Sequence, residues 1–191
     1  MIVLQLILFC ALFTLMVKIA VGNNALNGLY FYPKPVQERA FEIGLTNPEA
    51  VARKRKWFMI PFFLVMLAAL VLIIGLWNGI KTYRSAYLQA LLFLEVMNWY
   101  DGIVIDKLWV GYSKFWLLPG CEDIPYVQTW KQVLKKRGIL TLIWVIGAAI
   151  VAERSTCVLK TFIVSGKESK RWDCLRVLYP RQGNRKAFWE R

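Results

Sequence analysis

The hydrophobic positions of this chain gather in four long runs separated by polar segments. The runs cover about residues 1–21, 57–80, 86–110 and 134–152. A helix needs ~20 mostly apolar residues to cross a bilayer, and every run except the shorter last one supplies that length. Lys18 interrupts the first run, but it lies close enough to the end to reach the interface. The pattern predicts an all-α fold, a polytopic membrane helical bundle with four transmembrane helices.

Short interfacial helices are expected between the first two runs. Val36, Ala40 and Ile43 fall on one face of a short helix. A second helix then begins with Asn47 as N-cap and Pro48 in the first helical position. This second helix should continue through a basic segment into the second run.

The net charge of +13, from 25 Lys and Arg against 12 Asp and Glu, is concentrated beside the apolar runs. One basic cluster precedes the second run and another begins the fourth, as in segments that meet anionic headgroups. The expected partners are therefore membrane lipids with anionic headgroups and not nucleic acid, for which no recognition motif is present. The expected headgroup contacts are Arg53, Lys54, Arg55, Lys56, Lys135, Lys136 and Arg137.

Residues 1–152 are predicted to form the transmembrane domain and residues 153–191 a basic C-terminal tail. With four spans, both basic clusters share one side of the cell membrane, and the positive-inside rule makes that side cytoplasmic. The tail then lies with the N-terminus on the other side, unless the third run only re-enters the membrane. The first run has a second interpretation as a cleaved signal peptide, but no positive charge precedes its apolar core.

The third run is the one that carries acidic side chains. Glu95, Asp101 and Asp106 lie in it, whereas residues 1–17 and 57–80 contain no charge. A carboxylate in a membrane helix costs at least ~2.5 kcal/mol by insertion scales and usually faces a bundle interior or a polar cavity. The third run is therefore where we expect the functional chemistry.

The predicted substrate or ion path, called here the acidic stripe, consists of Glu95, Asn98, Asp101 and Asp106. On an α-helix three of these residues share one face, on which Gly102 allows close approach of a neighbour, while Asp101 points away from it. The stripe could line a proton or cation path or hold a basic headgroup. In the alternative, structural interpretation, Glu95 is paired or protonated within the bundle and the two aspartates lie at the membrane interface.

The segment between the third and fourth runs is rich in aromatic rings. Such rings beside spans usually form a belt at the membrane interface, which is the favoured interpretation here. The alternative is a roof over a cavity beside the acidic stripe. The rings are Trp109, Tyr112, Phe115, Trp116, Tyr126 and Trp130.

Machinery for catalysis is scarce. The chain contains no histidine, which removes the usual general base and His-based metal sites; neither a phosphate-cradling loop nor a dinucleotide fingerprint is present. None of Cys121, Cys157 and Cys174 has CxxC spacing, so we expect neither a metal site nor a cofactor. A Cys157–Cys174 disulfide is conceivable only if the tail lies outside the cytoplasm.

Three segments resemble a group of small multipass bacterial membrane proteins of uncharacterised function. These segments are residues 30–40, 101–111 and 119–123, and the resemblance extends over roughly residues 28–152. The resemblance implies a helical membrane fold and no particular activity.

Together these observations favour a non-enzymatic membrane protein, either a small transport or permeation unit or a subunit of a larger assembly. Four helices are few for a complete transporter, so a homo-oligomer or a partner membrane protein is expected, with Gly147, Ala148 and Ala149 as a close-packing face. Two alternatives remain open. One is a membrane-embedded enzyme acting on a lipid or isoprenoid with the stripe carboxylates as acid and base, and the other is a scaffold that binds anionic lipid or an acidic partner.

Overall fold

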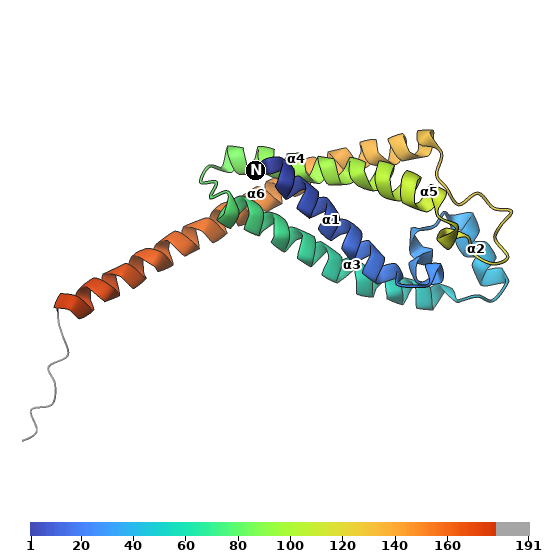
Figure 1. The fold of residues 1–191 in the computed structure, drawn as a ribbon, viewed down its shortest axis with the longest axis horizontal. Coiled ribbons are helices and arrows are strands. Elements are labelled where there is room, and N and C mark those ends of the chain that lie inside the picture. Colours follow the sequence, from blue (N-terminus) through green and yellow to red (C-terminus); the bar gives the residue numbers. More distant parts are fainter. Residues whose placement is uncertain (179–191) are drawn as a thin grey trace, which may run out of the picture.

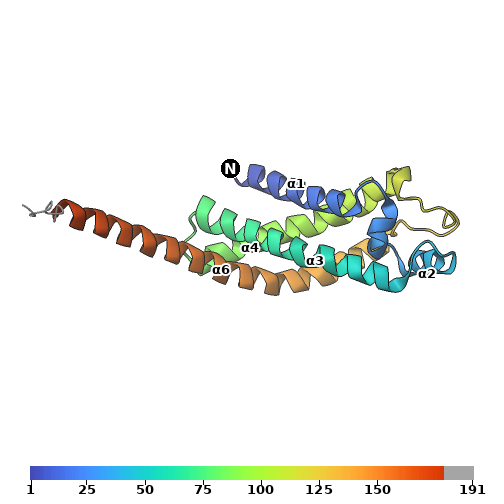
Figure 2. The ribbon, with the colours of Figure 1, turned by 90° about the horizontal axis from the view of Figure 1, so that it is seen from below.

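The computed structural model describes the backbone of residues 1–178 and the side chains of residues 1–158. Four helices in this part are long and apolar enough to cross a membrane: Ile2–Val21, Pro48–Trp77, Tyr83–Tyr112 and Trp130–Val158. They run side by side as a bundle (Figures 1 and 2). The predicted all-helical bundle with four candidate spans is thereby confirmed.

Every element of the described chain is helical. The elements are α1 (Ile2–Val21), η1 (Ala25–Phe31), α2 (Lys34–Glu42), α3 (Pro48–Val71), η2 (Leu72–Trp77), α4 (Tyr83–Tyr100), η3 (Asp101–Trp109), α5 (Val110–Tyr112), η4 (Lys114–Trp116) and α6 (Trp130–Leu178). The segments η1 and η4 are 3-10 helices, whereas η2 and η3 are π-helices that continue α3 and α4. Helix α6 continues past residue 152, where the sequence predicted the tail to begin, and its last part projects alone from the bundle (Figure 1).

The start of α3 follows the sequence signal. The Asn47 side chain accepts a hydrogen bond from the backbone N–H of Ala50 at 2.7 Å, and Pro48 occupies the first helical position. Helix α2 buries Val36 and Ala40 as expected. Ile43 lies just beyond its end and is exposed.

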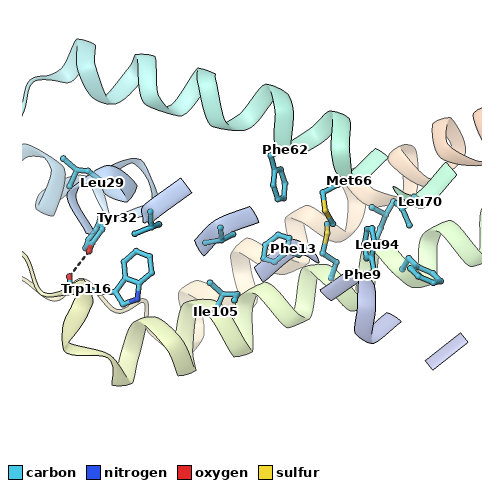
Figure 3. Packing of buried hydrophobic residues seen from close by; sticks show 14 of the residues in the cluster. Phe9, Phe13, Leu29, Tyr32, Phe62, Met66, Leu70, Leu94, Ile105 and Trp116 are labelled. Carbon is cyan, nitrogen blue, oxygen red and sulfur yellow. Dashed lines mark hydrogen bonds between the residues drawn. The ribbon is translucent and has the colours of Figure 1, made fainter. Parts of the chain in front are cut away.

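Helix α1 contributes one of its faces to the core of the bundle. Phe9 makes an edge-on ring contact with Phe93 of α4 at 5.6 Å. Phe13 makes one with Phe62 of α3 at 5.5 Å, and both of these rings are labelled in Figure 3. Near its N-terminal end, Gln5 exchanges two hydrogen bonds with the turn after η2. Its Nε2 donates to Asn78 Oδ1 at 2.7 Å, and Asn78 Nδ2 donates to Gln5 Oε1 at 3.1 Å. Both ends of α1 are thus fixed to other parts of the chain, since Val21 at the other end is fully buried.

The small residues of α6 pack against other helices of the same chain. Ala148 is fully buried, and a Cβ on Gly147 would lie 3.8 Å from a Leu94 methyl of α4. A Cβ on Gly75 of η2 would lie only 3.0 Å from the Ser155 carbonyl oxygen, so η2 also crosses α6 closely. Gly147 and Ala148 thus take part in packing within the chain, whereas a role of Gly147, Ala148 and Ala149 in association between chains stays a prediction.

The two ends of the bundle differ in what they carry. The N-terminus, the turn at residues 78–82 and the projecting part of α6 lie at one end (Figures 1 and 2). The elements η1 and α2 and the loop at residues 117–129 lie at the other end, where α3 and α6 begin with their basic clusters. This is the arrangement of ends that the four predicted spans require. The Cys174 side chain lies outside the described residues, as do residues 179–191.

Candidate functional site

A buried arginine of α6 joins two carboxylates of η3. Arg137 is 2% exposed, and its Nη1 donates to Asp101 Oδ2 at 2.6 Å while its Nη2 donates to Asp106 Oδ2 at 2.5 Å. Lys136 Nζ contacts the same Asp106 oxygen at 3.3 Å. Charge-assisted hydrogen bonds of this kind are the strong ones, and the two carboxylates compensate a charge that would otherwise be costly to bury. We call Asp101, Asp106, Lys136 and Arg137 the ion cluster.

The π-helical backbone of η3 explains why both aspartates reach one arginine. In an α-helix, residues five apart point ~140° away from each other. In a π-helix the hydrogen bonds join residues five apart, so Asp101 lies about one turn from Asp106 on the same side. The prediction that Asp101 points away from the stripe was wrong because it assumed a regular α-helix.

Gly102 makes room for the arginine, as the sequence suggested for this position. A Cβ built on Gly102 would lie 2.7 Å from Arg137 Nε and 3.1 Å from its Cγ. Real Cβ atoms do not approach other atoms so closely. The absence of a side chain at this position is what allows Arg137 to cross η3 and reach both carboxylates.

The remaining stripe residues are also paired with α6. Asn98 Nδ2 donates to the Arg137 carbonyl oxygen at 3.1 Å and lies 3.4 Å from Thr141 Oγ1. Thr141 Oγ1 in turn donates to Glu95 Oε2 at 2.8 Å. The acidic stripe therefore forms a continuous row of polar contacts with α6, which is the pairing that the structural interpretation expected for Glu95.

Two of the partners were assigned differently or not at all by the sequence. Arg137 was expected to contact lipid headgroups, but it is buried because it compensates Asp101 and Asp106. Thr141 was not among the site residues that the sequence predicted. The signal that could have found both is their spacing, since residues four apart on a helix share a face. The expected headgroup residues Arg53, Lys54, Arg55, Lys56 and Lys135 are exposed.

A cavity of about 280 Å³ lies beside the ion cluster. All four ion-cluster residues and Asn98 contribute to its wall, and the rest of the lining is mainly apolar. The apolar and aromatic lining comes from α1, η1 and the residue after it, α3, α4, η3, η4 and α6. It includes Phe13, Val17, Phe31, Tyr32, Phe58, Met59, Phe62, Met97, Ile105, Trp116, Leu140 and Trp144.

Aromatic residues from outside the spans close the cavity at the end of the bundle that carries η1. The Tyr32 hydroxyl donates to the Trp116 carbonyl oxygen at 2.8 Å (Figure 3), and Trp116 is itself 2% exposed. Burial raises the pKa of Tyr32 well above its usual value, with contributions from nearby Tyr126 and Cys121, so the hydroxyl remains a donor. The roof interpretation is therefore right for Trp116 and Tyr126, which both line the cavity. Tyr112 stays strongly exposed, as a belt residue would.

Several buried polar atoms of the cavity wall have no hydrogen-bond partner among the described residues. They are the indole Nε1 of Trp116, the indole Nε1 of Trp144, the Nε of Arg137 and the side-chain Oδ1 of Asn98. Most buried polar groups in proteins are paired. Each of these atoms has almost no accessible surface, so they are unpaired within the described part of the protein and are not exposed to the cavity.

Comparison with known proteins adds nothing to this geometry. None of the family models, curated proteins or solved structures compared with the chain matches it. The chemistry of the site therefore has to be argued from its own residues.

Proposed function

We propose that this chain is a multi-pass protein of the cell membrane that binds a lipid-like amphiphile in the cavity beside the ion cluster. It would act without catalysis, as a lipid-handling transport unit or as the lipid-binding subunit of a larger membrane assembly. The observation that carries the proposal is the composition of the cavity wall, which is charged on one side and aromatic or aliphatic elsewhere.

Membrane insertion is supported by the outer surface of the bundle. Large apolar side chains point outward and are well exposed on all four long helices, which a soluble protein would avoid. Examples are Ile7 on α1, Leu64 on α3, Leu88 on α4 and Leu142 on α6.

The depth of the cavity suits an amphiphile. The uncharged part of α3 begins directly after the basic residues 53–56, and Phe58 and Phe62 of the cavity wall follow Lys56 by two and six residues. At 1.5 Å per residue these rings lie only ~3 and ~9 Å along the helix from the basic cluster. The ion cluster, which shares the cavity with these rings, would thus lie near the boundary between headgroups and acyl chains. A ligand could place its polar group there and its hydrocarbon part against α1 and α3.

The same contacts disfavour the other roles considered for the stripe. A path for hydrated ions needs polar groups that face a continuous aqueous lining, whereas Glu95 and Asn98 are paired with α6. A general base needs a carboxylate available for a proton, whereas Asp101 and Asp106 both accept hydrogen bonds from Arg137. Binding an amphiphile requires neither.

A pair of tryptophan substitutions on α6 tests the proposal. Leu140 lines the cavity, whereas Leu142 on the same helix points outward and is 70% exposed. The full-length chain is purified in mild detergent, and bound lipid is counted by native mass spectrometry. We expect Leu140→Trp to retain one lipid fewer than the unsubstituted chain, since the indole fills the cavity, and Leu142→Trp to retain the full number.

Equal lipid retention by the two variants, with unchanged circular dichroism, would contradict the proposal. If Leu140→Trp fails to fold, Leu140→Phe is the milder substitution that makes the same comparison against Leu142→Phe. Expected partners of the assembly, whether further copies of this chain or another membrane protein, would appear in the same spectra as higher masses.

A further inference from the structure

A second hollow lies at the same end of the bundle, between α1, η1 and α3. It is an open groove of about 410 Å³. It shares Phe58 with the cavity described above but none of the ion-cluster residues. Its floor is made by apolar residues of α1 and α3, and its outer end carries Lys54, Asn27 and Tyr30.

The charge at the outer end of this groove is purely positive. Lys54 Nζ donates one hydrogen bond to Asn27 Oδ1 at 2.9 Å, and an ammonium group has two further donors. No carboxylate of residues 1–158 lies within ion-pair distance of Lys54, and no lining residue of the groove is acidic. The Lys54 ammonium group can therefore donate to an anion in the groove, and its contact with Asn27 holds the ammonium group in position.

The inner part of the groove is suited to a hydrocarbon chain. Met16, Ile19 and Ala20 of α1 face Pro61 of α3 across it. From Lys54 to Pro61 the groove follows α3 for ~10 Å, at 1.5 Å per residue. Trp57 is 77% exposed beside the groove, and tryptophan is enriched where membrane interfaces meet acyl chains.

We propose that this groove is a binding site for one phospholipid with an anionic headgroup. The Lys54 ammonium binds the phosphate, and the upper part of one acyl chain lies between α1 and α3. The proposal assigns a specific contact to Lys54 alone among the four exposed basic residues at positions 53–56. It goes beyond the function proposed above, since it concerns a different site.

The test measures phospholipid retention by the full-length chain in native mass spectrometry, with phosphatidylglycerol and phosphatidylcholine as separate probes. We expect tighter retention of phosphatidylglycerol. Lys54→Gln should weaken that retention by about tenfold, the size of effect that loss of one charge-assisted hydrogen bond produces. The control is Lys56→Gln, which removes the same charge two residues away from a side chain that does not line the groove, and it should change retention little.

A second pair of variants tests the acyl-chain part without changing any charge. Ala20→Phe should fill the groove and lower retention of phosphatidylglycerol, whereas Ala11→Phe on the exposed face of α1 should not. Equal losses from Lys54→Gln and Lys56→Gln would overturn the proposal in favour of diffuse attraction to a basic cluster. An effect of Lys54→Gln without any effect of Ala20→Phe would overturn it in favour of simple phosphate binding.

The two sites can be distinguished in the same instrument. Of the two substituted residues, Leu140 lines only the cavity and Lys54 lines only the groove. If Leu140→Trp does not lower lipid retention, only the proposal for the cavity is contradicted. If Lys54→Gln does not lower it, only the proposal for the groove is contradicted.

Discussion

Replacing Gly102 by alanine should destabilise the folded protein, although alanine is the better helix former. In an open helical position the change from glycine to alanine stabilises by ~1 kcal/mol. Here the new Cβ would lie 2.7 Å from Nε, 3.1 Å from Cγ and 3.2 Å from Cδ of Arg137. The arginine cannot swing aside freely, because both of its terminal nitrogens are bound to Asp101 and Asp106.

The expected size follows from these contacts. Forcing an extra carbon into a filled site costs ~1–3 kcal/mol. If the arginine gives up one of its two hydrogen bonds to carboxylates, a further ~1.5–3 kcal/mol is lost. After subtraction of the ~1 kcal/mol gain in helix propensity, we expect Gly102→Ala to lower the free energy of unfolding by ~1.5–5 kcal/mol when one hydrogen bond is given up.

Gly138 of α6 is the matched control, since it directly follows Arg137 and a Cβ there would meet nothing within 4 Å. Gly138→Ala should therefore stabilise the protein by up to ~1 kcal/mol. Both variants are unfolded in one detergent by titration with sodium dodecyl sulfate and followed by far-ultraviolet circular dichroism. If Gly102→Ala proves as stable as Gly138→Ala, the arginine does not cross η3 at this glycine and the account of the ion cluster is wrong.

Three further predictions concern single side chains. Thr141→Val removes the hydroxyl bound to Glu95 and should cost ~1–3 kcal/mol; in a double-mutant cycle with Glu95→Leu the two losses should not add, and additive losses would refute the contact. Tyr32→Phe leaves the Trp116 carbonyl oxygen without its donor and should cost ~1 kcal/mol at neutral pH. Because the pKa of Tyr32 is raised in the folded chain above its ordinary value of 10.0, its stabilisation is complete below pH 10 and is lost as pH rises further, so Tyr32→Phe should flatten the alkaline part of the stability profile. Burial raises the pKa of the Cys121 thiol, so at pH 8 a maleimide should label Cys121 far more slowly in the folded chain than in denaturant, and equal rates would show that the loop is open.

The long helices could be predicted from the sequence because their signals are local. An apolar run of about 20 residues has few alternatives in a membrane protein, and Asn47 followed by Pro48 fixes the start of α3 within the chain itself. These features do not depend on what lies beside them.

The candidate site was only partly predictable because it depends on contacts between helices. The carboxylates were found from their cost in an apolar run, but their partner Arg137 belongs to a basic cluster that resembles a headgroup contact. The position of Asp101 depends on a π-helical hydrogen-bond register, and π-helical segments are rare, so a regular α-helix was the expectation. The burial of Trp116 depends on η1 folding back over the end of the bundle, which no local pattern of aromatic residues indicates.

The two hydrogen bonds between Gln5 and Asn78 affect the position of α1 along its whole length, including the end that lines the cavity and the groove. Sliding α1 by one residue would move Gln5 ~1.5 Å along the axis and turn it by ~100°, so neither amide bond could survive. Most contacts of α1 are apolar and have no preferred direction, whereas the Gln5–Asn78 hydrogen bonds are directional. This pair therefore fixes the position of α1 along the axis of the bundle. Because the same helix forms a wall of the cavity and of the groove ~12–23 Å further along, the width of each is set in part by two amides near the opposite end of the bundle.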